Sequence, residues 1–202
     1  MRLLIDTDAF YKLAVGNILD DAIGLFVTDL TCCGRLPALP YMLRKGRLRQ
    51  KLGEQLCDHL IPTVESIPVL PQPDARWLDK LAAVPAIDPG EAQIYALAAA
   101  NETTVLSGDK RALRALRNIP DYVEALSGRI VVLEALLIAL CARLGAVEVK
   151  RRIHPLVAHD KMVQICFSPE NFAPQEALDS YYRSLSEELE PLVLWNPCLG
   201  EQ

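Results

Sequence analysis

The sequence lacks the residue patterns on which several common kinds of site depend. It has six cysteines but no Cys-x-x-Cys pair, and its three histidines do not have metal-binding spacing, which argues against a zinc site. No Ser/His/Asp or Cys/His constellation stands out, so we expect no nucleophilic side chain in catalysis. Most of the cysteines lie in apolar surroundings, which predicts buried, reduced thiols and a cytoplasmic location.

Long apolar runs and an excess of positive charge are also missing. The longest apolar stretch, residues 130–142, contains Glu134 and is shorter than the ~20 residues of a membrane span, so we expect a buried helix there and no membrane contact. Residues 1–6 reach an acid where the apolar core of a signal peptide would continue. The net charge of −5 argues against tight non-specific duplex binding, although it allows a local basic patch.

What the sequence does contain is an alternation of strand and helix patterns. About half of the 202 residues are apolar, which is enough for one domain with a substantial core. We expect strands at 3–5, 25–27, 103–106 and 129–133. We expect helices at 8–18, 41–60, 74–84, 88–100, 110–117, 134–157 and 174–192, and an extended proline-rich connector at 62–73. This alternation predicts an α/β fold with a mainly parallel sheet.

Three acids stand where this pattern changes from strand to helix. Asp6 ends the first strand, Asp109 follows the strand at 103–106, and Glu91 opens the helix at 88–100. Because ligands of parallel sheets bind beyond the carboxyl ends of the strands, we expect these acids to converge. A cluster of carboxylate oxygens suits Mg²⁺ or Mn²⁺.

Each acid also has a purely structural interpretation. Asp88 and Glu91 form a capping box at a helix start, and Asp109 can cap the helix that begins at Lys110. We expect Asp8 to cap the first helix, which leaves Asp6 free for another role. An ionised Asp6 at the end of a buried strand needs partners.

Three segments together resemble PIN domains, in particular the VapC-like toxins of bacterial toxin–antitoxin pairs. These are Leu-Leu-Ile-Asp-Thr-Asp-Ala-Phe at 3–10, Pro-Gly-Glu-Ala-Gln-Ile-Tyr-Ala-Leu-Ala-Ala-Ala at 89–100 and Val-Leu-Ser-Gly-Asp-Lys-Arg-Ala-Leu at 105–113. The resemblance implies a three-layer α/β/α fold and a Mg²⁺- or Mn²⁺-dependent endoribonuclease. It implies catalytic and metal-binding roles for Asp6, Glu91 and Asp109. Asp8, two residues after Asp6, is a nearby acid that could also reach the metal site, as a direct ligand or behind one. The resemblance covers about residues 1–140, so we expect a PIN-like domain at 1–153 and a helical C-terminal extension at 154–202 packed on it.

The sequence departs from the family at one acidic position. PIN domains usually carry a further acid early in their second major helix, where this chain has Tyr41 and Met42. Asp20 and Asp21 are better explained as a solvated helix end. The departure leaves open a catalytically weak or inactive PIN-fold protein that binds or regulates. A receiver-like phosphoryl acceptor fits less well, since the chain lacks a convincing central-strand Asp and a later strand-end Lys.

Basic residues close to the acids are candidates for substrate binding. Lys110, Arg111 and Arg114 follow Asp109 directly, and Arg44 belongs to a second basic helix. Such groups would position a phosphate backbone without reading its sequence, although solvated helix faces explain them equally well. The resemblance implies RNA as the substrate and an antitoxin protein as partner, and a homodimer is a further expectation.

Overall fold

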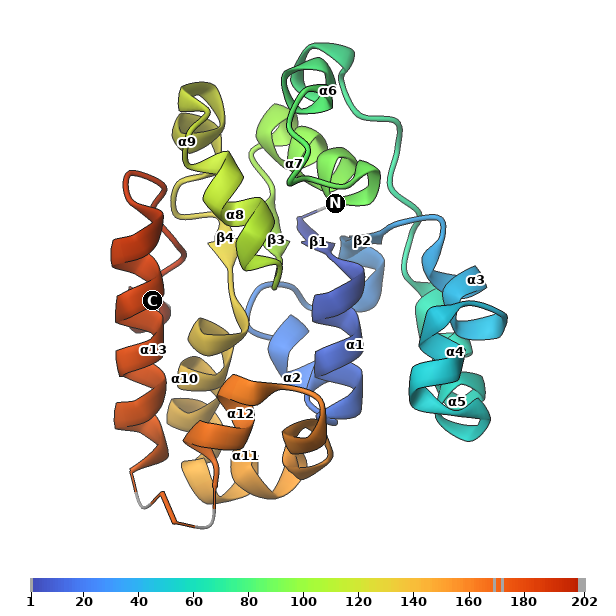
Figure 1. Ribbon diagram of the computed structural model, residues 1–202. Coiled ribbons are helices and arrows are strands. Elements are labelled where there is room, and N and C mark those ends of the chain that lie inside the picture. The colour runs from blue at the N-terminus through green and yellow to red at the C-terminus, as the bar shows by residue number, and fades with distance from the viewer. Residues whose placement is uncertain (1, 169, 172, 200–202) are drawn as a thin grey trace.

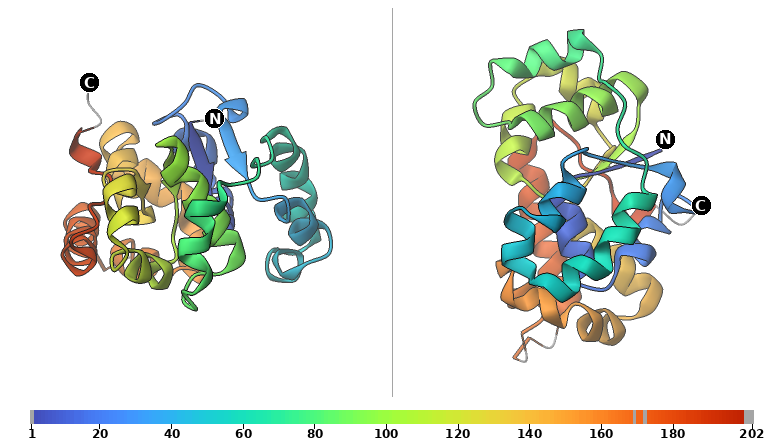
Figure 2. Two further views of the ribbon diagram at one scale, coloured as in Figure 1. Left: turned by 90° about the horizontal axis from the view of Figure 1, so that it is seen from above. Right: turned by 90° about the vertical axis from the view of Figure 1, so that its right-hand side faces the viewer.

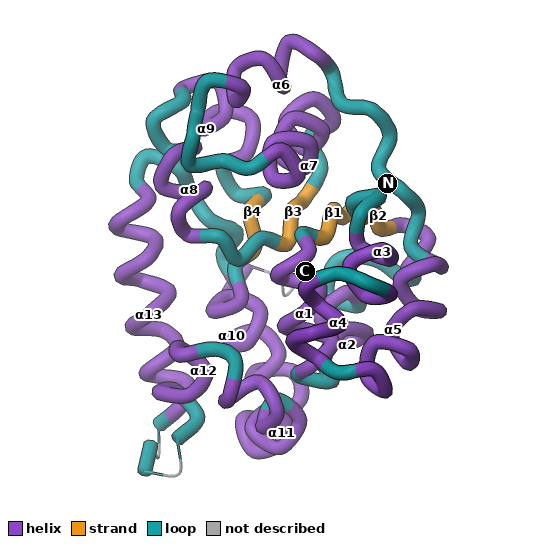
Figure 3. The backbone as a smooth tube through the Cα atoms, turned by 45° about the vertical axis from the view of Figure 1, so that its right-hand side comes forward, coloured by secondary structure: helices purple, strands orange, loops and turns teal. Residues whose placement is uncertain are grey.

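The computed structural model describes residues 2–168, 170–171 and 173–199. Within them, four parallel strands form one sheet in the order β2-β1-β3-β4, visible as a row of short strands in Figure 3. The strands are β1 (Leu3–Ile5), β2 (Cys33–Arg35), β3 (Thr104–Leu106) and β4 (Ile130–Val131). None of the described helices is long and apolar enough to cross a membrane.

Helices surround the sheet and make up most of the chain (Figure 1). The α-helices are α1 (Thr7–Val15), α2 (Leu19–Ile23), α3 (Leu39–Arg44), α4 (Arg47–Leu52), α5 (Glu54–Ser66), α6 (Ala75–Ala82), α7 (Pro89–Asn101), α8 (Lys110–Leu116), α9 (Pro120–Leu126), α10 (Leu133–Leu144), α11 (Ala146–Arg152), α12 (Lys161–Cys166) and α13 (Pro174–Leu189). Three short 3₁₀ helices are η1 (Leu30–Cys32), η2 (His154–Ala158) and η3 (Pro197–Leu199).

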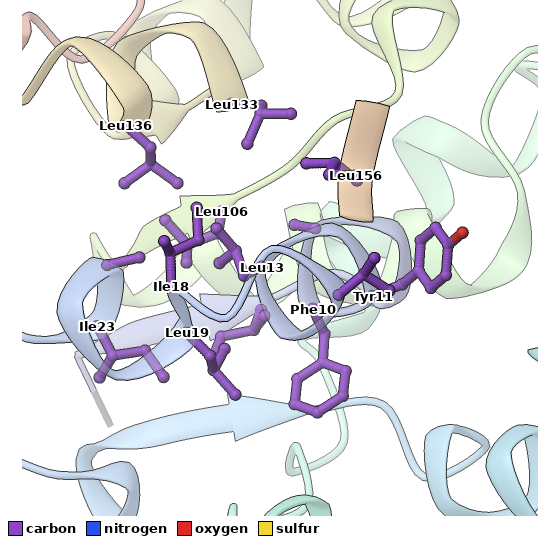
Figure 4. Packing of buried hydrophobic residues seen from close by; sticks show 14 of the residues in the cluster. Phe10, Tyr11, Leu13, Ile18, Leu19, Ile23, Leu106, Leu133, Leu136 and Leu156 are labelled. Atoms are coloured by element: carbon purple, nitrogen blue, oxygen red, sulfur yellow. The ribbon is translucent and has the colours of Figure 1, made fainter. Parts of the chain in front are cut away.

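The sheet separates two hydrophobic cores, which makes the fold a three-layer α/β/α sandwich as predicted (Figure 2). Side chains alternate along the strands: Leu3 and Ile5 of β1 belong to one core and Leu4 to the other. The first core holds the buried faces of α1, α2, α3, α5 and α10, part of which is shown in Figure 4. The second holds those of α7, α8 and α9. Because both faces are covered, the central strand β1 (Leu-Leu-Ile) and the pair Ile130 and Val131 of β4 are apolar, as is typical of parallel sheets, whereas the edge strand β2 contains Arg35.

The C-terminal segment is built into both cores. Met162 and Val163 of α12 and Leu178 of α13 lie in the first core. Leu185 and Leu189, also of α13, lie in the second core. Further along, the Trp195 amide donates to the Ile130 carbonyl of β4 at 2.8 Å. The segment after residue 153 therefore packs on the same body as the rest of the chain.

Two expectations about the N-terminal half are wrong. Residues 25–27 form no strand, and the edge strand is Cys33–Arg35. The short apolar run at 25–27 instead ends the turn after α2, and its Val27 amide bonds to the Ile23 carbonyl. Apolar runs of this length do not distinguish strand from turn by themselves.

The single helix expected at 41–60 is divided into three. α3 ends at Arg44, Gly46 precedes α4, and Gly53, with φ of 81°, separates α4 from α5. Glycine is favoured at such a left-handed backbone position because it has no Cβ. α5 then continues through Pro62 to Ser66, so the connector expected at 62–73 begins only after this helix.

A truncation of Leu178 tests whether α13 belongs to the folded body. Leu178 is fully buried in the first core, so Leu178→Ala should lower the free energy of unfolding by roughly 2–5 kcal/mol. Val147→Ala is the control, because Val147 on α11 is 85% exposed and should change stability by less than about 0.5 kcal/mol. Urea unfolding monitored by circular dichroism measures both. Equal stability of the two variants would show that α13 does not contribute to the cooperative core.

Candidate functional site

A pocket of about 810 Å³ opens at the carboxyl end of the sheet. It lies where β1 and β3 end, since its lining includes Asp6 directly after β1 and Gly108 and Asp109 shortly after β3. The chain leaves β1 into α1 on one face of the sheet and leaves β3 into α8 on the other. This is a topological switch point, the place where open α/β sheets bind their ligands.

Five carboxylates line this pocket, and three of them are the acids singled out in the sequence. They are Asp6, Asp8, Asp88, Glu91 and Asp109. The loop after β3 approaches α1 closely, because a Cβ on Gly108 would lie only 3.0 Å from the Asp8 carboxylate. The pocket therefore brings together acids from three segments that are far apart in the sequence.

Two of the acids begin the helices that follow the strands. Asp6 is the N-cap of α1 and accepts the Thr7 amide at 2.7 Å. Asp109 is the N-cap of α8 and accepts the amides of Arg111 and Ala112 at 2.8 and 3.1 Å through Oδ1. The expectation that Asp8 caps the first helix is wrong, since Asp8 lies in the first turn instead. In both caps these backbone amides bond to Oδ1 of the carboxylate.

Glu91 belongs to a complete capping box. Asp88 accepts the Gly90 and Glu91 amides at 2.8 and 2.9 Å, and Glu91 Oε2 accepts the Asp88 amide at 2.7 Å. Behind it, Tyr95 of α7 shares a buried 2.7 Å hydrogen bond with Ser107 in the loop after β3. The structural interpretation of Glu91 is thus correct, and the same box directs its carboxyl group into the pocket.

Burial makes two of these carboxylates, Asp6 and Glu91, hard to ionise. Burial, opposed by the Thr7 amide, raises the pKa of Asp6 to about 6. Burial and the neighbouring charges of Asp109 and Asp88 raise the pKa of Glu91 to about 8. Burial also acts on Asp109, but hydrogen bonds from the Ala112 amide and from Glu91 outweigh it, so the pKa of Asp109 lies below its usual value. Glu91 therefore holds the proton of this pair at neutral pH.

The carboxylate oxygens of the pocket are suitable ligands for Mg²⁺ or Mn²⁺, but the side chains do not stand close enough together to hold the ion. All the donors are carboxylate oxygens, which these ions prefer. In the described part of the chain, however, no group of three Asp, Glu, His or Cys side chains stands close enough to hold an ion. The Arg111 guanidinium lies 3.4 Å from Asp109 Oδ2 and 4.0 Å from Glu91 Oε2. A divalent cation would have to displace this side chain and turn the carboxylates toward itself.

Five cations share the pocket with the acids: Lys12, Arg47, Lys51, Lys110 and Arg111. Lys110 contacts the buried Glu134 at 2.6 Å. Lys12 bridges Asp8 at 2.9 Å and Asp160, from the C-terminal segment, at 3.0 Å. Burial opposes the charge of Lys12, but the two carboxylates outweigh it and raise its pKa.

Two of the predicted substrate-binding residues lie elsewhere. Arg44 pairs with Glu65 and lines a separate surface pocket. Arg114 pairs with Glu188 of α13, so the C-terminal helix neutralises that side of α8. Lys110 and Arg111 are the two members of the predicted set that line the acidic pocket.

The two residues at the position where the resemblance expects a further acid line different pockets. Met42 of α3 lines the pocket, whereas Tyr41 is 65% exposed and lines the separate pocket with Arg44. A carboxylate at position 42, not at position 41, would face the other acids.

Of the lining residues, Asp88 and Lys12 are absent from the site that the sequence predicts, and Arg47 and Lys51 belong to its second basic helix without being singled out. Asp88 has a sequence signal, because a capping box next to a candidate ligand places both of its acids at the same helix end. Lys12 has one too, four residues after Asp8 on the same helix face. For Arg47 and Lys51 the signal is the basic helix pattern, but which of its cations line the pocket depends on how α4 packs.

Comparison of the chain with protein-family models, with curated proteins and with solved structures finds no match. Function is therefore inferred from the pocket itself.

A substitution of Glu91 tests the protonation of the pair. Because the pKa of Glu91 rises from 4.5 in the unfolded chain to about 8 when folded, the folded state binds the extra proton and its stability falls as pH rises through this window. Gln mimics the protonated acid, so Glu91→Gln should match the unmutated protein at about pH 5 and exceed its stability by several kcal/mol at about pH 9. Urea unfolding at both pH values measures this difference.

Asp109→Asn should change the stability of the folded protein in the opposite direction. A lowered pKa contributes stability above the unfolded value of 3.8, so this variant should lose stability at neutral pH. If both variants shifted stability in the same direction at neutral pH, the assignment of the proton to Glu91 would be wrong.

Proposed function

We propose that this protein is a Mg²⁺- or Mn²⁺-dependent nuclease acting on RNA, with a site of the PIN type. The observation that carries the proposal is the lining of one pocket by Asp6, Asp8, Asp88, Glu91 and Asp109 together with basic side chains. Two of these acids, Asp6 and Glu91, are buried, and buried carboxylates are costly to ionise unless a cation neutralises them. Their position at the switch point of a parallel sheet favours a ligand-binding role.

Different side chains of the pocket would have different roles in phosphodiester hydrolysis. Asp6, Glu91 and Asp109 would hold the ion through the oxygens that capping leaves free. An ion held there would supply a water molecule of lowered pKa and would offset charge on the scissile phosphate. Lys110, fixed by Glu134 at 2.6 Å, and Arg111, once displaced from the acids, would hold the phosphate in place. Asp8 is a further ligand candidate, although Lys12 already pairs with it.

RNA as the substrate, and the toxin role with its antitoxin partner, rest on the three PIN-like segments. The fold supports them to the extent that it is three-layered and joins the matching acids in one pocket. A cytoplasmic site of action agrees with free cysteines at the described positions. A homodimer is part of the same proposal.

A second candidate is a nucleic-acid-binding or regulatory protein that does not cleave. Met42 at the position of the usual fourth acid favours it, and so does the ion pair of Arg111 with Asp109. The two candidates differ in one property, which is the binding of a divalent ion.

Metal binding is tested by thermal unfolding. Mn²⁺ at ~100 times its dissociation constant should add about 2.7 kcal/mol to the stability of the folded protein. Asp6→Asn removes a charged ligand and should abolish most of this gain. The same variant should lower Mn²⁺-dependent cleavage of a mixed RNA pool by about 10²-fold or more.

Asp20→Asn is the matched control, since Asp20 is exposed on α2 and does not line the pocket. It should keep both the stabilisation and the cleavage. A melting temperature of the unmutated protein that millimolar Mn²⁺ leaves unchanged would contradict the nuclease and favour the non-cleaving protein.

Restoring the missing acid should strengthen metal binding. Met42→Glu adds a carboxylate to the pocket lining and should tighten Mn²⁺ binding about tenfold or more, a gain of at least ~1.4 kcal/mol. Tyr41→Glu adds the same charge one residue away, outside the pocket, and should change the affinity little. Isothermal titration with Mn²⁺ compares them, and equal affinities for the two variants would show that position 42 does not face the metal site.

A further inference from the structure

The part of the pocket formed by α4 carries cations that the acids do not neutralise. Arg47 and Lys51 line the pocket and lie four residues apart, on one face of the helix. Among the described residues, neither has a carboxylate within ion-pair distance, whereas Lys12, Lys110 and Arg111 each have one. Arg49, on the same helix, pairs with Asp58 at 2.7 Å and Glu54 at 3.6 Å. The unpaired charge of α4 is therefore concentrated on its pocket side.

Tyr11 of α1 adds a polar atom that lacks a partner. Its side chain lines the pocket and is 1% exposed. Among the described residues, its hydroxyl is a buried polar atom that makes no hydrogen bond. The ammonium group of Lys51 lies 4.2 Å from the centre of its ring, which holds the cation beside the hydroxyl-bearing side chain. Figure 4 shows the ring at the end of the packed core, with the hydroxyl pointing away from Leu13 and Leu106. A buried hydroxyl without a partner is costly, so a ligand that accepts from it gains affinity.

The three groups together suit one chemical class of ligand. Two flexible cations and a hydroxyl donor are the groups that hold phosphate oxygens in nucleic-acid complexes. The pocket volume of about 810 Å³ falls in the ~300–1,000 Å³ range of sites for small ligands, which fits nucleotides of a single strand better than a duplex. Arg47, Lys51 and Tyr11 line the same pocket, and their helices α4 and α1 lie side by side in Figures 1 and 3.

We propose that Arg47, Lys51 and Tyr11 form a phosphate subsite for single-stranded RNA. This subsite would hold a phosphate next to the scissile phosphate at the proposed metal site. The choice of RNA rests on the proposed function, whereas the subsite itself rests on the α4 cations and the Tyr11 hydroxyl. It binds the strand without a metal ion, and it gives the acidic pocket an electrostatic means of attracting a polyanion.

The test measures binding of a fluorescein-labelled single-stranded RNA of mixed sequence by fluorescence anisotropy in EDTA. Without divalent ions no metal-dependent cleavage occurs, and the cations of the chain provide the attraction. Arg47→Ala combined with Lys51→Ala should weaken binding at least tenfold at low salt. The slope of log affinity against log salt concentration should fall by about 0.7 for the lost phosphate contact.

Two further variants complete the design. Tyr11→Phe keeps the ring under Lys51 and removes only the hydroxyl, so it should weaken RNA binding several-fold while leaving the melting temperature unchanged or higher. Arg44→Ala combined with Lys45→Ala is the charge-matched control, because both residues line the separate pocket. This control should bind RNA nearly as tightly as the unmutated protein.

The outcomes separate the subsite from the nuclease. If both double variants lose affinity equally, or if the unmutated protein binds no RNA, the subsite is wrong. If Tyr11→Phe binds as tightly as the unmutated protein, the hydroxyl is not part of it. If the α4 variant loses RNA binding while Mn²⁺ fails to stabilise the unmutated protein, the subsite stands and the nuclease proposal falls.

Discussion

The parallel pairing of β1 with β3 is the constraint on which the rest of the structure depends. Leu4 lies opposite Val105 and Ile5 opposite Leu106, and the Asp6 amide extends the ladder to the Leu106 carbonyl at 3.0 Å. This register places the starts of α1 and α8 at the same edge of the sheet, on opposite faces. Because helix starts select acidic caps, the pairing concentrates carboxylates at one place before any function is considered.

A carboxylate that caps a helix at this pocket can therefore also take part in the proposed metal binding. Each of Asp6, Glu91 and Asp109 uses an oxygen for a backbone amide, and the same contact fixes the direction of the remaining oxygen. The ionised carboxylates are costly in this position, because burial raises the pKa of Asp6 and that of Glu91. A proton on Glu91 and the guanidinium of Arg111 reduce this cost in the metal-free chain. In the proposed metal complex a divalent ion would replace both groups, so metal binding, protonation and stability would form one linked equilibrium.

Much of the fold and of the acidic pocket could be predicted from the sequence, because short apolar strands and helix-capping residues are local signals. The capping box at 88–91 and the position of Asp109 are examples. The edge strand at 33–35 could not be predicted, since Cys-Gly-Arg has no strand pattern and its pairing with β1 is set by tertiary contacts. Arg44 and Arg114 show the same limit. Their charge is evident in the sequence, but their partners Glu65 and Glu188 lie 21 and 74 residues further along the chain.

The central claim is that Asp6, Glu91 and Asp109 share a divalent ion once Arg111 has moved away. A crystal structure of the protein grown with Mn²⁺, with the ion located by its anomalous scattering, tests this claim most directly. The account predicts one or two anomalous peaks with carboxylate oxygens of these residues at ~2.0–2.3 Å and the Arg111 guanidinium displaced from Glu91. A pocket without an anomalous peak, in which Arg111 still bridges Asp109 and Glu91, would contradict it.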